Sequence, residues 1–160
     1  MDNYTFLHTG SYVKITLHSI PERPGVFSKM TKVLADQNIN ILTIRHIAHS
    51  KDEGDIAFTV SKSSADLSIQ LMQENLQKIG AAGLSFKKDL ALVFISGDRV
   101  KNISRFASDI LRAFSEYGVE FDSLSLAAEG VTCILPEHQL TPAKHAFNKM
   151  FVDEPIISPI

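Results

Sequence analysis

The chain repeats one order of secondary-structure patterns, and corresponding positions lie about eighty residues apart. Met30 corresponds to Ile110, and residues 38–41 correspond to residues 118–121. Each copy predicts strand, helix, strand, strand, helix and strand, because apolar residues alternate in some segments and recur at helical spacing in others. The repeat places the chain in the α+β class, as two tandem ferredoxin-like βαββαβ units.

Short-range patterns define the expected elements. In the first unit we expect strands at 13–17, 40–48, 56–60 and 84–86 and helices at 26–34 and 67–79. Ser63 and Asp66 resemble a capping box for the second of these helices. In the second unit we expect strands at 91–95, 120–126 and 131–135, helices at 106–114 and 141–151, and a short strand within 155–160. The domains are therefore placed at 12–88 and 89–160, with 1–11 as an N-terminal extension or strand.

Two of the expected strands are apolar on both faces. In the strand at 90–95, leucine and phenylalanine alternate with alanine, valine and isoleucine, so one layer of helices cannot cover it. The cover is either the N-terminal segment with Tyr4 and Phe6 or a second subunit. The strand at 40–48 shows the same pattern, and both together predict a homodimer. The linker at 87–89 is too short for free tumbling, so the halves are expected to pack together.

Composition excludes several classes of protein. Lysine and arginine number 16 against 18 aspartate and glutamate, so the chain lacks the basic excess that binding to nucleic acid or to a membrane surface requires. Cys133 is the only cysteine, which rules out an intrachain disulfide and a cysteine-rich zinc site and indicates a core thiol. The sequence shows neither a signal-peptide pattern nor an apolar run of about 18 residues. We expect a cytoplasmic protein.

The first strand-to-helix turn carries the most specific pattern. Residues 20–26 read Ile-Pro-Glu-Arg-Pro-Gly-Val, residues 38–41 read Asn-Ile-Asn-Ile, and residues 55–60 read Asp-Ile-Ala-Phe-Thr-Val. This pattern resembles the ACT domain, a small-molecule-sensing module, and the tandem resembles the regulatory region of aspartate kinase from about residue 13 to 151. The resemblance implies feedback binding of lysine or threonine, dimerisation, and a kinase catalytic domain or subunit as a partner.

The same turn suits a ligand on physical grounds. A helix N-terminus leaves N–H groups unpaired, and Gly25 lets a carboxylate approach them closely. We expect a small amino acid with its carboxylate on the N–H groups of residues 25–27. Its amine is expected to meet Asn40 or a carbonyl of residues 38–40, at a seam with a neighbouring unit. The candidate effector-binding residues are Glu22, Arg23, Pro24, Gly25, Val26, Phe27, Asn38, Ile39, Asn40 and His46.

The chain departs from the family's pattern at several of its positions. Leu42 stands where the family usually has an acid, and His46 replaces a common glutamine. In the second unit the Pro-Gly pair becomes Ser104-Arg105, and a Ser-Glu signature becomes Ala127-Ala128. The first site is therefore expected to be usable but altered, and the second to be degraded.

The same residues leave three other functions open. A ligand-free dimerisation module needs no site at the turn. An acylphosphatase-like enzyme would use Arg23 and Asn40, but its glycine-rich phosphate cradle is replaced here by a turn with two prolines. An RNA-binding ferredoxin-like domain needs exposed aromatic and basic residues on its central strands, where this chain offers only Phe94.

We expect these 160 residues to have no catalytic residues, no cofactor and no kinase activity, because they contain no glycine-rich phosphate-binding motif. His18, His46 and His49 raise the possibility of a metal site. Surface histidines are the favoured interpretation, because no fixed ligand spacing accompanies them.

Overall fold

The computed structural model describes residues 3–151 and 156–159. The chain divides into two compact units, one formed by Ser11–Lys88 and the other by Met1–Gly10 together with Asp89–Ile160. Two long strands take part in both units, namely β1 (Tyr4–Pro21) and β4 (Gly83–Gly97). Each unit is described by itself below.

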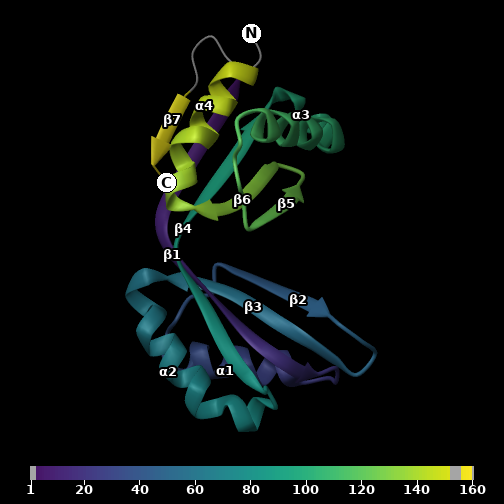
Figure 1. Cartoon of the computed structure of the whole chain (residues 1–160), viewed down its shortest axis with the longest axis vertical. Helices are drawn as coiled ribbons and strands as arrows, with labels where there is room; N and C mark the ends of the chain where they lie inside the picture. The colour runs from purple at the N-terminus through teal and green to yellow at the C-terminus, as the bar shows by residue number, and fades with distance from the viewer. Residues whose placement is uncertain (1–2, 152–155, 160) are drawn as a thin grey trace. The chain divides into compact units, whose positions relative to one another are not determined.

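The unit formed by Ser11–Lys88 has the ferredoxin-like arrangement. Between the second part of β1 and the first part of β4, the elements are α1 (Val26–Ala35), β2 (Thr43–Ala48), β3 (Glu53–Ser61) and α2 (Lys62–Ile79). The strand order is β2-β3-β1-β4, with β3 antiparallel to both β1 and β2. Both helices cover one face of these strands (Figure 1).

The core of this unit follows the predicted alternation in β1. Val13 pairs with Val60 and Ile15 pairs with Phe58, and all four side chains are buried. Met30 on α1 and several residues on α2 pack into the same cluster. Because successive side chains of a strand point to opposite faces, this alternation decides which face receives the helices.

The other unit repeats this order of elements, with β4 as the first strand of the repeat. After β4 come a short 3-10 turn (Asp98–Asn102), α3 (Ile103–Glu116), β5 (Ser123–Ala127), β6 (Gly130–Pro136), a second 3-10 turn (Glu137–Gln139), α4 (Leu140–Phe151) and β7 (Ile156–Pro159). The strand order is β5-β6-β4-β1-β7, and β7 runs parallel to β1. The α+β class and the tandem ferredoxin-like fold are thus confirmed.

The N-terminal segment extends this second sheet rather than covering its open face. Tyr4 and Phe6 join the core on the helix side, where Phe6 contacts Phe147 with ring centroids 5.2 Å apart. Leu92 and Phe94 on the other face of β4 stay half-buried. Of the two covers considered, the N-terminal segment therefore does not lie over this face. Cys133 is fully buried in the same core, as predicted, and its burial raises the pKa of its thiol to about 12.

Three local expectations are corrected. β4 runs without a break through residues 87–89, where a linker was expected, with Asp89 in the left-handed region at φ 56°. The capping-box prediction is wrong, because α2 begins at Lys62 and its N-cap is Ser61. β2 begins at Thr43 rather than at residue 40. Within the described residues, no helix is long and apolar enough to cross a membrane.

Candidate functional site

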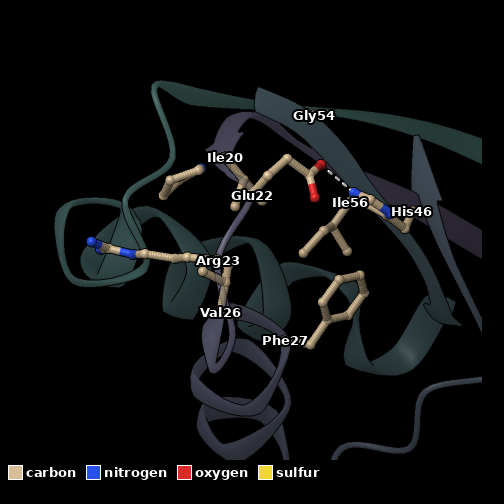
Figure 2. Close-up of a pocket in the computed structure, with 9 residues that line it drawn as sticks. Ile20, Glu22, Arg23, Val26, Phe27, His46, Gly54 and Ile56 are labelled. Atoms are coloured by element: carbon tan, nitrogen blue, oxygen red, sulfur yellow. Dashed lines mark hydrogen bonds and ion pairs between the residues drawn. The ribbon is translucent and has the colours of Figure 1, made fainter. Parts of the chain in front are cut away.

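A shallow hollow lies between the first turn, the start of α1 and strands β2 and β3. Its empty volume is about 220 Å³, part of which is open to solvent. Figure 2 shows the side chains that surround it. The lining residues are Ile20, Pro21, Glu22, Arg23, Val26, Phe27, His46, Gly54 and Ile56. Five of the ten predicted effector-binding residues are among them.

A side-chain hydrogen bond joins the turn to β2 across this hollow. The Glu22 carboxylate contacts Nε2 of His46, and both side chains remain partly exposed, at 25% and 38%. The ring of Phe27, on the first turn of α1, meets the His46 ring edge to face with centroids 5.6 Å apart. Figure 2 shows this arrangement, with Ile56 beneath the pair. The Glu22 carboxylate can accept hydrogen bonds from an ammonium group in the hollow.

The space for the Glu22 side chain depends on Gly54. A Cβ atom at Gly54 would clash with Oε1 of Glu22 and with the carbonyl oxygen of Ile47. Arg23 extends away from the Glu22–His46 pair (Figure 2) and runs toward Gly80. Of the two charged residues of the turn, only Glu22 therefore presents its charge to the hollow.

The N-terminus of α1 adjoins the hollow. Gly25 is the N-cap and has φ 92°, a left-handed conformation that glycine adopts without strain. A Cβ atom at Gly25 would meet nothing within 4 Å, and Pro24 beside it is exposed. Within the described part of the chain, no side chain caps the first N–H groups of α1. These donors and the positive end of the helix dipole are therefore free to meet an anion.

The corresponding helix of the other unit has its own cap. The Asn102 side chain accepts a hydrogen bond from the N–H of Arg105, at 3.2 Å, at the start of α3. One of the donors that α1 leaves free is thus already satisfied in α3. The two helix starts therefore differ, because among the described residues α3 has a side-chain cap and α1 has none.

Residues 38–40 lie at the other end of α1. The helix has 10 residues, so its two ends are about 15 Å apart at a rise of 1.5 Å per residue. Asn38 lies in the turn after α1 and has φ 54°, Ile39 is buried in the core, and Asn40 is exposed. Within one unit, a single small amino acid cannot touch both Gly25 and Asn40.

The three histidines separate into two places. His18 Nδ1 and His49 Nε2 each lie 3.1 Å from Oδ2 of Asp55, whereas His46 meets Glu22. All three rings are surface-exposed, as predicted, and the described residues contain no cluster of three or more ligating side chains that could hold a metal ion.

Asp55 is strongly acidic in this setting. Burial alone would raise the pKa of the Asp55 carboxyl, but the N–H of Ser19 and the rings of His49 and His18 lower this pKa to about 2. Sequence reasoning included Asp55 only as part of a family pattern and assigned it no role.

Sequence reasoning also missed four residues that line the hollow. Ile20 and Pro21 precede the predicted residues directly, and Gly54 and Ile56 come from β3. The signal for Gly54 was available, because a glycine at the start of a strand often marks a close approach of another group.

Comparisons with known proteins match the first unit to a domain family. The ACT-domain family model matches residues 15–77. An aspartate kinase from Pseudomonas fluorescens is 24% identical over 139 residues, which are 86% of this chain and 33% of that protein. This chain therefore spans about a third of the length of the curated relatives it matches.

Solved structures show the same fold over both units. The regulatory subunit of aspartate kinase from Thermus flavus matches with a TM-score of 0.82 and 22% identity, covering 92% of this chain and 97% of that chain. E. coli aspartokinase III in complex with lysine and aspartate matches with a TM-score of 0.65 and 16% identity, over 92% of this chain and 33% of that chain. The resemblance inferred from the first turn is confirmed: the ACT-domain family model matches residues 15–77, and the chain has the tandem ferredoxin-like fold of aspartate kinase regulatory subunits.

Proposed function

We propose that this chain senses a small amino acid, of the lysine or threonine class, in the hollow at the first turn, and thereby regulates an aspartate kinase catalytic domain or subunit. The observation that carries the proposal is the pairing of an uncapped helix N-terminus with the Glu22 carboxylate at one hollow of an ACT unit. The structure that this chain covers almost completely is a regulatory subunit, which supports a regulatory rather than a catalytic role.

The two charged groups of an amino acid have separate partners at this hollow. The ligand carboxylate binds the N–H groups at the start of α1, where the helix dipole favours negative charge. The ligand ammonium binds Glu22 and replaces the His46 ring there. This assignment differs from the sequence expectation for the amine, because Asn40 lies at the far end of α1.

Residues 38–40 enter the proposed site only from a second copy of the chain. The edge strand β2, which follows them, exposes Ile44 and Ile47 at 42% and 37%, and Leu42 directly before it is 41% exposed. An edge with exposed apolar residues is suited to pairing with another strand. We therefore include a homodimer in the proposal, with the β2 edges in contact.

The structure does not support the acylphosphatase-like or the RNA-binding alternative. An acylphosphatase-like site needs Arg23 and Asn40 on one phosphate, yet Arg23 extends away from the hollow and Asn40 lies beyond the other end of α1. Phe94, the aromatic residue on which an RNA surface would depend, is half-buried. The ligand-free dimerisation module remains the competing function, and it predicts no response to amino acids.

A thermal-shift screen of the twenty amino acids tests the proposal. A ligand held at one hundred times its Kd stabilises the folded protein by about 2.7 kcal/mol, which raises the melting temperature by several degrees. We expect lysine, threonine or a close analogue to give the largest rise. If no amino acid changes the melting temperature at millimolar concentration, the chain is not a sensor of this class.

A further inference from the structure

A β-bulge in β1 lies directly before the effector turn. Leu17 pairs with Ile56 and Ile20 pairs with Gly54, so two residues of β1, His18 and Ser19, lie opposite one residue of β3. Ser19 has φ 54°, in the left-handed region. The single residue opposite this bulge is Asp55. A bulge of one extra residue bends its strand and changes which face the following residues point to.

The Asp55 carboxylate holds both residues of the bulge. Its Oδ1 accepts the N–H of Ser19 at 3.0 Å, and its Oδ2 lies 3.1 Å from Nδ1 of His18. The same Oδ2 lies 3.1 Å from Nε2 of His49, in the turn between β2 and β3. The other ring nitrogen of His18 contacts Ser85 Oγ on β4 at 2.7 Å. One side chain, 15% exposed, thus ties the bulge to β3, to the turn after β2 and, through His18, to β4.

The bulge determines how the chain enters the turn. Leu17 points into the core. In a regular strand Ile20, three positions later, would point to the opposite face, because side chains alternate. With the bulge, Ile20 is buried at 3% exposure, and Pro21 and Glu22 follow from that orientation. The N–H of Glu22 then donates to the carbonyl of Asp52 at 2.9 Å. The direction of Glu22 toward the hollow therefore depends on the bulge being kept.

We propose that Asp55 is a positioning residue for the effector turn: by holding the Ser19 N–H and the His18 ring, it fixes where Glu22 and the start of α1 meet a ligand. The expected effect on ligand binding rests on the proposed function, whereas the effect of Asp55 on the conformation of the turn does not. Asp55 itself is not among the residues that line the hollow. Its substitution therefore acts on binding indirectly, through the groups that its carboxylate holds.

Two variants separate positioning from simple stability. Asp55→Asn keeps the size of the side chain and an acceptor oxygen but loses the charge that both rings share. Val60→Ala removes buried methyl groups from the same strand, in the core and away from the bulge, and serves as the matched destabilised control. Both variants are compared with the native protein by melting temperature and by ¹H–¹⁵N spectra.

The first readout uses no ligand. We expect Asp55→Asn to shift the amide signals of residues 19–27 other than Pro21 and Pro24, which have no N–H. We expect Val60→Ala to leave these signals in place at a similar loss of melting temperature. If the signals of residues 19–27 are unchanged in Asp55→Asn, the positioning role is wrong. If both variants shift these signals equally, Asp55 is a stability residue only.

The second readout is the affinity for the amino acid that most stabilises the native protein. We expect this affinity to fall about tenfold in Asp55→Asn and to be retained in Val60→Ala. Equal affinities in all three proteins would overturn the positioning role. A native protein that binds no amino acid would overturn the proposed function instead, while the spectra without ligand still decide whether Asp55 holds the turn.

Discussion

The Glu22 carboxylate contacts Nε2 of His46, and this pair joins the first turn to strand β2 across the hollow. The His46 ring therefore occupies the position at Glu22 that the proposed site assigns to the ammonium group of an amino acid. The charged group of the hollow, the Glu22 carboxylate, thus has a hydrogen-bond partner from the chain itself. Binding replaces one charge-assisted hydrogen bond by another, so the gain comes mainly from the ligand carboxylate and from burial.

The two members of the pair are expected to respond differently to substitution. Glu22→Gln removes the partner of the ammonium, so affinity for the amino acid falls about tenfold or more. His46→Gln removes the competitor, so affinity is retained or increases. Titration calorimetry on both variants measures the two effects. An equal loss of affinity in both would mean that His46, rather than the ligand, is the functional partner of Glu22.

Gly25 is expected to be required for its backbone conformation. An alanine at φ 92° is strained, so Gly25→Ala costs on the order of 1 kcal/mol of stability and weakens binding by moving the first N–H groups of α1. Gly118 provides the matched control, because it also has positive φ, 64°, and no neighbour within 4 Å of a Cβ. Gly118→Ala is expected to cost similar stability in the other unit. If Gly25→Ala responds to the amino acid normally and Gly118→Ala does not, the site lies in the other unit.

Structural features that depend on residues close together in the sequence could be predicted. The alternation of Val13, Ile15 and Leu17 predicted the buried face of β1 correctly. The positions of α1 and α4 followed from apolar spacing and from the proline and glycine near their starts, and the pattern of residues 20–26 located the hollow. All of these are short-range features, which a single sequence records directly.

Features that depend on distant partners were not predictable in the same way. The bulge at Ser19 exists because Asp55, 36 positions away, holds its N–H, and neither residue alone indicates this. The first part of β1 joins the unit of residues 89–160 because strand pairing is decided by the whole fold. The contact expected between the ligand amine and residues 38–40 requires a neighbouring unit, because the length of the predicted helix already separates Asn40 from Gly25 of the same unit.

The exposed edge of β2 is expected to carry the homodimer contact. Ile44→Lys places a charge on this edge, so it should convert the dimer to a monomer. Leu67→Lys on α2 is the matched control, because Leu67 is also 42% exposed but lies on a helix. Sedimentation of the three proteins at micromolar concentration measures the effect. A native protein that sediments as a monomer throughout, or a monomeric Leu67→Lys variant, would argue against contact through β2.

Asp55 is expected to make stability depend on pH in the acid range. Its pKa is about 2 in the folded protein against a usual value of 3.8, so its ionised form stabilises the fold above the unfolded value. This contribution is lost as the pH falls from about 4 toward about 2. The melting temperature of Asp55→Asn should therefore lie furthest below the native value above pH 4 and approach it near pH 2.

Asp36→Asn is the control for that pH series. Asp36 forms an exposed ion pair with Lys32 at 2.9 Å, and exposed pairs contribute little. Its melting temperature should stay close to the native value at every pH. A gap between Asp55→Asn and the native protein that stays constant down to pH 2 would contradict the low pKa of Asp55.

A ¹H–¹⁵N titration with the most stabilising amino acid tests the central claim most directly, because one series of spectra reports on both units. The account predicts saturable shifts of the amide signals of His46 and of residues 22–28 other than Pro24, which has no N–H. The signals of residues 98–105 should stay unchanged, because Asn102 already caps α3. Saturable shifts centred on residues 98–105, with residues 22–28 unaffected, would contradict it.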